Sequence, residues 1–497
     1  MTVAFNNIPS DAAVPLFYGE VDNSMANTAS QTYRRLIVAQ VNDNVDLPIS
    51  ELTLLSRESD AISLGGDGSM LAAMYKRARL IDQMGEIWVL PVKVATGQAA
   101  KGTLTFAGAA TESGLINAYV GSTRVRAAVA NGQTAAETAA ALATVINDTA
   151  GLPVTAAAVD GVVTLTVRWK GDTGNDLLLS INQQGIAANE RTPAGLTVGV
   201  AQPSGGMGSP EVAELLALVG DEDFEFIGSP YTDVTSLDDL KEWMSDSVGR
   251  WSYAQQLYGH VYSARRGTLG ESVAFGRVRN DQHVSTLTVE PAAPDPVWLW
   301  TAAFLARTAV FTSADVGRPT QTGVLNGIKP APSGKRFIQT ERQSLLTNGM
   351  ATQTYSGGNV QIERAVTMYQ RNSYGQRDNS YFDSETMHQI GYTMRRLRSV
   401  ITSKYGRHNL ADDGTQFGEG AAIVTPKIIR GELIAEYRAM EREGIVENAD
   451  LFAKYLIVER DANNPNRINV LYPPDYVNQL RIFALVNQFR LQYPEAA

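Results

Sequence analysis

The alternation of strands and helices along this chain is interrupted and then resumes, which limits the folds it can adopt. Residues 34–41 and 86–92 are apolar runs typical of buried strands, and residues 68–84 carry apolar side chains at three- and four-residue steps. This strand–helix–strand unit predicts a parallel pair with a right-handed crossover. Because the same alternation returns after the interruption, we expect one discontinuous α/β domain made of residues 31–95 and 210–317.

The interrupting segment, residues 96–205, is rich in Ala, Thr, Gly and Val. Thr134 and Glu137 have the spacing of a helix N-cap and its capping partner, which predicts a helix beginning there. Asp160 and Gly161 lie between two β-rich runs and predict a two-residue hairpin turn. We expect a small α+β domain inserted into the α/β domain as a protrusion.

Residues 318–476 have a third pattern. Gly357 and Gly358 separate two alternating runs and predict a hairpin, and helices are expected over residues 384–404 and 431–442. We expect an α+β C-terminal domain here. The predicted fold class is therefore multidomain, α/β and α+β, with extended strand arms at both ends.

Both ends carry apolar side chains on segments without a helical period. The arm of residues 1–30 contains prolines, which favour an extended backbone, and the arm of residues 477–497 is read mainly as a strand. The stretch 479–493 spans about 50 Å at about 3.3 Å per residue, and a free strand edge of that length recruits another chain. We expect both arms to lie on another surface. Their apolar residues are Phe5, Ile8, Leu16, Phe17 and Tyr18, and Leu480, Ile482, Phe483, Leu485, Val486, Phe489 and Leu491.

A glycine-rich loop, from Gly65 to Gly68, precedes the first helical pattern and has the flexibility of a phosphate-binding loop. A Walker loop ends in Gly-Lys-Ser/Thr, but Ser69 follows Gly68 directly, and Leu71 occupies the third glycine position of a dinucleotide fingerprint. We therefore expect a structural turn in which Asp67 or Ser69 caps the helix. A nucleotide-binding α/β enzyme that uses this loop is the alternative function.

No residue pattern predicts catalysis, a cofactor or a metal site, and we expect no enzyme. The chain lacks cysteine, which excludes disulfides, thiolate zinc sites and a cysteine nucleophile. Glu385 and His388 have half the spacing of a di-iron helix pair, without a second copy. Glu363, Asp383 and Glu385 are expected to be solvated or paired surface groups. Two histidines fall in or at the start of expected strands, one on a helix face and one in a loop: His260, His283, His388 and His408.

Charge and hydropathy limit the partners. The net charge is −10 and no basic run occurs, so we expect no nucleic-acid partner. The longest apolar stretch, residues 297–306, is too short to span a bilayer, and the first residues lack the pattern of a signal peptide. We expect a soluble protein that does not insert into a membrane.

Four blocks of sequence, in order along essentially the whole chain, resemble the tail sheath proteins of Mu-like contractile-tailed bacteriophages. The first two are FNNIPSDAAVPLFYGEVDNSMA and GDGSMLAAMYKRARLIDQMGEIWVLPV. The third is the inserted segment, with GQTAAETAAALATVIN and VTLTVRWKGDTGND. The fourth is TERQSLLTNGMATQTYSGGNVQIERAVTMYQ.

The resemblance implies a structural virion subunit of a viral contractile tail ejection system. Such subunits polymerise helically, in stacked rings that are hexameric, around the tail tube, and contract to drive the tube through the host envelope for genome ejection. The implied partners are further copies of the chain, the tail tube protein, and the baseplate and tail terminator proteins, with assembly in the host cytoplasm. The two arms would add strands to sheets of neighbouring subunits.

Two further readings stay open at the level of sequence. A contractile injection particle or tailocin would use the same fold and the same mechanics. The inserted segment, residues 96–205, is alternatively an adhesin that binds a host ligand by itself.

Overall fold

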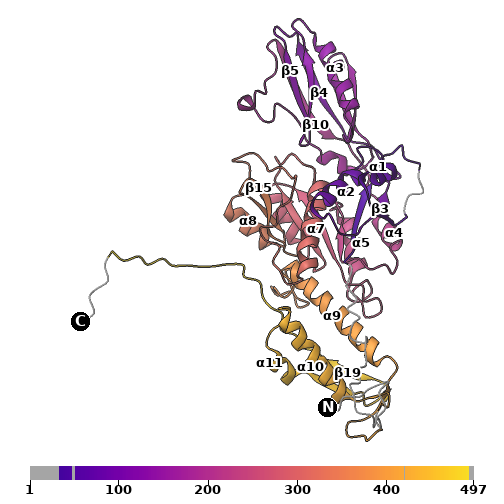
Figure 1. The fold of residues 1–497 in the computed structure, drawn as a ribbon. Coiled ribbons are helices and arrows are strands. Elements are labelled where there is room, and N and C mark those ends of the chain that lie inside the picture. The colour runs from indigo at the N-terminus through magenta and orange to yellow at the C-terminus, as the bar shows by residue number, and fades with distance from the viewer. Residues whose placement is uncertain (1–32, 47–50, 419, 492–497) are drawn as a thin grey trace, which may run out of the picture.

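The computed structural model describes residues 33–46, 51–418 and 420–491. The body is elongated, with three parts arranged along its length (Figure 1). The inserted segment lies at one end and the central sheet with its helices in the middle. From there α9 (Ser384–Tyr405) runs into a mainly helical part at the other end.

The central sheet has the strand order β13–β12–β11–β1–β3–β2. β1 pairs in parallel with β3 on one side, which confirms the expected strand–helix–strand unit, and with β11 on the other. Since β11 follows the inserted segment in sequence, both sides of the insertion contribute to one sheet. β2 runs antiparallel at the edge. The strands are β1 (Arg35–Gln40), β2 (Thr53–Leu55), β3 (Ile87–Val92), β11 (Phe226–Gly228), β12 (His260–Arg266) and β13 (Val284–Val289).

Helices cover both faces of this sheet, because its strands are apolar on both faces. In β1, Leu36 and Val38 enter one core, and Ile37 and Ala39 enter the other. A parallel sheet needs this two-sided cover. The helices are α2 (Met70–Ile81) and α7 (Val297–Ala314) on one face, and α4 (Val212–Ala217), α5 (Val234–Met244) and α6 (Leu269–Arg277) on the other. α1 (Glu58–Gly65) and β2 were not predicted from the sequence.

The inserted segment contains two antiparallel sheets, β10–β4–β8–β7 and β6–β5–β9, and α3 packs against strands of both. The capping box of Thr134 and Glu137 begins α3, as predicted. Asp160 and Gly161, with φ of 48° and 86°, form the predicted turn of the β7–β8 hairpin. The elements are β4 (Lys101–Gly108), β5 (Gly114–Val120), β6 (Thr123–Val129), α3 (Ala135–Asp148), β7 (Val154–Val159), β8 (Val162–Val167), β9 (Leu179–Ile181) and β10 (Leu196–Ser204).

A short helix and a hairpin follow α7. The hairpin turns at Gly357 and Gly358, as predicted. Its side chains Val360 and Ile362 belong to the core beneath the central sheet, so the hairpin extends the central body. The elements are α8 (Gln339–Leu346), β14 (Thr352–Ser356) and β15 (Asn359–Arg364).

The far end of the molecule has a core of its own. Tyr437 stacks on Phe452 there, with ring centroids 3.7 Å apart. α10 begins at Pro426 after its cap Thr425, five residues before the predicted start, because proline fits the first turn of a helix. The elements are β16 (Asn409–Leu410), β17 (Ile423–Val424), α10 (Pro426–Arg442), α11 (Ala449–Tyr455), β18 (Ile457–Arg460) and β19 (Ile468–Leu471). None of the helices in the described part of the chain has the length and hydropathy of a membrane-spanning segment.

Candidate assembly surface

The glycine loop before α2 is a structural corner that is filled by protein. Ser69, one of the two predicted caps, accepts a hydrogen bond from the first turn of α2 at 3.1 Å. The Asp67 carboxylate accepts a hydrogen bond from the Gly151 amide of the inserted segment at 3.0 Å. A Cβ added at Gly68 would lie 2.0 Å from the Leu152 carbonyl oxygen. The inserted segment therefore occupies the space in front of this loop that a bound phosphate would need.

Replacing Gly68 by alanine should destabilise the fold strongly. The new Cβ would collide with the Leu152 oxygen, and the φ of +71° is unfavourable for any side chain. We expect a loss of about 3 kcal/mol in the free energy of unfolding, from left-handed strain of about 1 kcal/mol and overpacking of about 2 kcal/mol. Gly132→Ala is the matched control, because its φ is +85° but no atom lies within 4 Å. Urea denaturation should show that this control loses only about 1 kcal/mol in the free energy of unfolding.

The same variant tests whether the glycine loop is a structural turn or a nucleotide-binding site. Calorimetric titration of the parent chain with ATP and with NAD should show no binding. Nucleotide binding by the parent that Gly68→Ala abolishes and Gly132→Ala preserves would contradict the structural role of the loop.

The carboxyl ends of the parallel strands are also covered by the inserted segment. In a sheet of this strand order, ligands commonly bind at the carboxyl ends of the neighbouring strands β1 and β11, because the chain leaves these two strands toward opposite sides of the sheet. Here Gln40, at the end of β1, donates to the Lys170 carbonyl oxygen at 2.8 Å and accepts from the Thr173 hydroxyl at 2.6 Å. Asp176 pairs with Arg266, at the end of β12, at 2.7 Å. The inserted segment thus covers the ends of β1 and β12, and beside it a pocket of about 210 Å³ remains, lined by Asp172, Thr173 and Asp176 of the insert and by residues that follow β11.

His388, on α9, lies in a buried polar chain. Its Nε2 is 2.7 Å from the Tyr262 hydroxyl and its Nδ1 is 2.5 Å from Glu225, which also pairs with Arg395. Tyr262, His388 and Glu225 are each at most 4% exposed, so no substrate reaches the hydroxyl. Burial alone would raise the pKa of Glu225, but Arg395 and His388 outweigh it and lower that pKa. The chain of contacts ties α9 to β12 and to the residue before β11.

The other histidines have separate partners. His260 is 2.8 Å from the Ser285 hydroxyl, and burial lowers its pKa well below the ordinary value, with further contributions from His388 and His283. The backbone amide of His283, just before β13, donates a hydrogen bond to the Asp281 carboxylate at 2.8 Å. The Nε2 atom of His283 lies 3.1 Å from a surface carboxylate. Within the described ranges, no three His, Asp or Glu side chains are placed to hold a metal ion.

The carboxylates singled out in the sequence are paired, and one of them is buried. Glu363 pairs with Arg342 at 2.8 Å, as predicted for a paired group. The prediction of a surface position is wrong for Glu385, which is 0% exposed and accepts two hydrogen bonds from Thr320, at 2.8 and 2.7 Å. Its position in the first turn of α9, packed beneath a loop, buries it, and the helix N-terminus favours its charge.

The C-terminal tail, residues 477–491, is attached to the body over its first five residues. The side-chain amide of Gln389 donates to the Val477 carbonyl oxygen at 3.2 Å. That of Gln321 donates to the Leu480 carbonyl oxygen, also at 3.2 Å. These contacts come from α9 and from the loop after α7, which together form the root of the tail.

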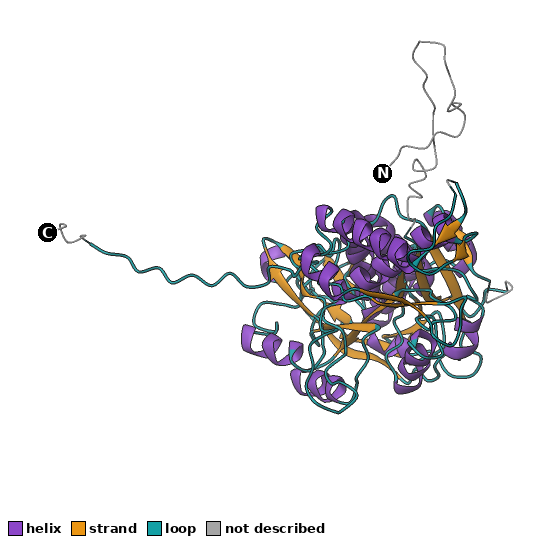
Figure 2. Cartoon of the chain, turned by 90° about the horizontal axis from the view of Figure 1, so that it is seen from below, coloured by secondary structure: helices purple, strands orange, loops and turns teal. Residues whose placement is uncertain are grey.

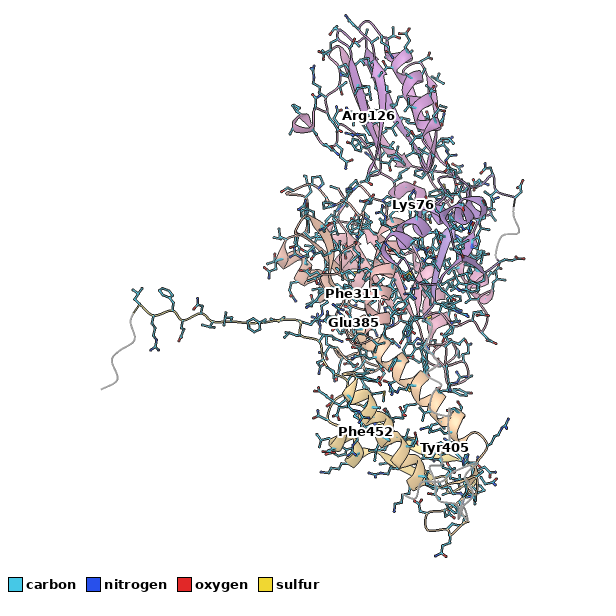
Figure 3. The ribbon with its side chains drawn as sticks, in the orientation of Figure 1. Lys76, Arg126, Phe311, Glu385, Tyr405 and Phe452 are labelled. Atoms are coloured by element: carbon cyan, nitrogen blue, oxygen red, sulfur yellow. The ribbon has the colours of Figure 1, made fainter. Side chains whose placement is uncertain are left out.

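Arg481 completes the root. Its Nη2 lies 3.2 Å from Asp383 and 3.1 Å from Glu385. Asp383 also forms two hydrogen bonds with Arg364, both at 2.8 Å. Figure 3 labels Glu385 at the end of α9 near which the tail leaves the body.

Beyond Arg481 the tail runs away from the body in both views (Figures 1 and 2). Between Ile482 and Leu491, no backbone hydrogen bond joins it to another described residue. Its large apolar side chains are 72–97% exposed, and neighbouring pairs place them on both faces of the extended chain. They are Leu480, Ile482, Phe483, Leu485, Val486, Phe489 and Leu491.

The strand predicted over residues 479–493 is not formed in the described part of this segment. A strand requires a neighbouring strand with which it forms a ladder of backbone hydrogen bonds, and residues 482–489 have no such neighbour among the described residues. The sequence does alternate, but the backbone N–H and C=O groups of residues 482–489 form no backbone hydrogen bond with another described residue and are available to a partner.

The small sheet at the far end of the molecule is incomplete. β18 and β19 pair with each other, and neither pairs with a third strand among the described residues. Val458 and Ile468 pack against the core beside α10. Ile457 and Leu471, which are directly opposite each other, are 51% and 59% exposed. The outer face also carries the polar pair Glu459 and Asn469. A two-stranded ribbon with an exposed apolar pair and two free edges among the described residues is suited to accept further strands.

The predicted N-terminal arm lies outside the described residues, so its role stays a prediction. Its apolar residues are Phe5, Ile8, Leu16, Phe17 and Tyr18.

Comparison with known proteins gives matches along the chain. The family described as the phage tail sheath protein central domain matches residues 205–368, and that described as the phage tail sheath C-terminal domain matches residues 376–490. The chain is 37% identical over 495 residues to the Mu-like prophage FluMu tail sheath protein of Haemophilus influenzae. That alignment covers 99% of this chain and 100% of the relative.

Two solved structures are similar at low identity. The sheath tail protein of Desulfitobacterium hafniense has a TM-score of 0.49 at 12% identity, with 94% of this chain and 97% of that chain covered. The sheath tail protein Lin1278 of Listeria innocua also has a TM-score of 0.49 at 12% identity, with 92% and 95% covered.

Proposed function

The chain belongs to the phage tail sheath family as a Mu-like tail sheath protein, and we propose that it polymerises around a tail tube and contracts to eject the phage genome. In this role it is a structural component of the virion and performs no catalysis. Its partners are further copies of itself in stacked hexameric rings, the tail tube protein, and the baseplate and tail terminator proteins. Assembly takes place in the cytoplasm of the host cell.

The observation that carries this proposal is the C-terminal tail. An extended segment with large apolar side chains on both faces is unfavourable in water, because each such side chain gains about 1.5–3 kcal/mol when it is buried. The body of the same chain does not cover it within the described residues. A tail of this kind is stable when a second copy of the chain covers it.

We infer that the tail is a donor strand and that the β18–β19 ribbon of another subunit is its acceptor. Residues 482–489 of the tail and both edges of the ribbon have backbone groups without a ladder partner among the described residues, and the ribbon carries an exposed apolar pair, Ile457 and Leu471. Main-chain hydrogen bonds would hold the joint, while alternate side chains would set its register. Donor and acceptor are different surfaces of one chain, so the contact is heterologous and propagates as a helical polymer.

The domain limits form part of the proposal. We assign residues 1–30 and 477–497 to the arms, 31–95 with 210–317 to the α/β domain, and 96–205 to the protrusion. We assign residues 318–476 to the inner domain that faces the tube. Within residues 318–476, the β14–β15 hairpin shares its core with the central sheet, so the inner domain and the α/β domain pack together there.

Contraction is proposed to be mechanical. Each subunit passes between two packings, and its neighbours bias the choice. A few kcal/mol per subunit, summed over many subunits, would supply the work without ATP. The tails would keep subunits connected while the rigid bodies rotate, and release at the baseplate would start the change.

Negative-stain electron microscopy of the purified full-length chain tests the proposal. We expect striated tubes or stacked rings with a central channel, formed either alone or when the chain is co-expressed with its tube protein. Monomers under both conditions would contradict the proposed polymer.

A further inference from the structure

A charged residue interrupts the apolar tail at the point where the tail leaves the body. Leu480 and Ile482 are 72% and 79% exposed, whereas the Arg481 side chain between them is only 10% exposed. Arg481 therefore turns back into the body while its neighbours face outward. An arginine at this position contributes nothing to an apolar donor strand, so its inward position requires a separate explanation.

The surroundings of Arg481 are balanced in charge. Asp383 and Glu385 face Arg481 and Arg364, so two carboxylates meet two guanidinium groups. A groove of about 470 Å³ beside the root is lined mainly by polar and charged side chains. Ion pairs, rather than apolar packing, therefore hold the tail at this point.

Removing the Arg481 side chain would leave two carboxylates with one guanidinium group. Glu385, which is 0% exposed, would keep hydrogen bonds only with neutral partners such as Thr320, and the remaining cation nearby, Arg364, is already paired with Asp383. A buried carboxylate without its cation is strongly unfavourable, and salt screens a buried pair less than an exposed one. The root is therefore held, while the ten described residues after it have no backbone hydrogen bond to the body.

We propose that Arg481, held by Asp383 and Glu385, is a latch that sets the direction in which the tail leaves toward a second copy of this chain. This inference rests on the proposed function of the tail as a donor strand. A segment that is fixed in its bound direction loses less freedom on binding than a freely pivoting one. The latch therefore strengthens the joint without contacting the neighbouring subunit.

Substitutions at Arg481 distinguish the contribution of its charge to assembly from the contribution of its packing. Arg481→Met keeps the length of the side chain but removes its charge, and should raise the protein concentration at half-assembly about tenfold or more. Arg481→Lys keeps the charge and should stay within about threefold of the parent. Arg191→Gln is the control, because it removes an exposed ion pair of the inserted segment with Glu112. Light scattering and electron microscopy of the full-length variants give these concentrations.

Spin-label distances test the direction of the tail itself. The chain has no cysteine, so Phe483→Cys and Ser399→Cys place two labels without background, one on the tail and one on the exposed face of α9. Below the assembly concentration, we expect one narrow distance distribution in the parent. Arg481→Met should broaden it and Arg481→Lys should restore it, whereas a purely stabilising role would leave the width unchanged.

The outcomes distinguish this proposal from the one on which it rests. If removal of residues 482–497 leaves assembly intact, the donor-strand function is wrong. If that removal blocks assembly while Arg481→Met assembles like the parent, or leaves the distance distribution narrow, the latch alone is overturned. Loss of assembly in both Arg481→Met and Arg481→Lys, with the same narrow distribution, also overturns it.

Discussion

Removing residues 482–497 should leave a folded monomer that no longer forms tubes at concentrations where the parent assembles. The side chains of Ile482, Phe483, Leu485, Val486, Phe489 and Leu491 are 75–97% exposed, so the body should lose no stability. If the neighbouring subunit buries only four of them at about 1.5 kcal/mol each, the joint loses about 6 kcal/mol, or about 10⁴-fold in the association constant. Sedimentation across a concentration series measures this loss, and thermal unfolding checks the fold.

A full-length control distinguishes the effect of losing the apolar side chains from the effect of a general change in the tail. Asn487 and Gln488 are polar residues within the same exposed segment, and changing both to serine keeps the length and polarity. This variant should assemble nearly as the parent does. Tubes formed by the truncated chain at the parent's concentration would show that the tail is not the joint.

Replacing Glu225 by alanine should lower the free energy of unfolding by about 3–5 kcal/mol, because it leaves buried positive charge without its partner. Glu225 is 4% exposed and contacts both His388 and Arg395. That loss is a large part of a typical stability of about 5–15 kcal/mol. Glu222→Ala is the matched control, because its ion pair with Arg34 is exposed and should contribute at most about 1 kcal/mol. Urea denaturation of tail-truncated monomers, followed by tryptophan fluorescence, measures both.

The acid dependence of the Glu225 variant has a defined sign. The pKa of Glu225 is lowered in the folded chain, so its ionised form adds stability that is fully present above the pKa of the unfolded state, about 4.3. This stability is lost as the pH falls through the folded-state pKa. The difference between the parent and Glu225→Ala should therefore be constant from pH 7 to about pH 5 and narrow below about pH 4. A difference that widened on acidification would contradict the role assigned to Glu225.

Local sequence patterns predicted many elements correctly, because those elements depend on neighbouring residues. The capping box at Thr134 and Glu137 begins α3, and the turn at Asp160 and Gly161 joins β7 to β8. The parallel pairing of β1 with β3 followed from two apolar strands around an amphipathic helix. The short elements β2 and α1 were missed, since their few residues give too weak a periodicity to identify.

The candidate assembly surface was only partly visible in the sequence. The apolar alternation of the tail identified the segment, but a strand could not be assigned to a single chain because its hydrogen-bonding partner lies elsewhere. The burial of Glu385 and its contact with Arg481 were not predicted. These two residues are 96 positions apart in the sequence, and neither has a local pattern that indicates an ion pair.

Residue types and their local spacing were sufficient to predict most of the long helices and strands, the interruption of the α/β pattern, the absence of thiol chemistry and the apolar character of the tail. Each of these depends on residue type and on spacing within one or two turns or a single strand. The folded arrangement was needed to see that the inserted segment packs against the glycine loop and covers the strand ends, and that Arg481 holds the tail at its root. Such contacts join residues far apart in the chain, and their free energy depends on burial and distance, which exist only once the chain has folded.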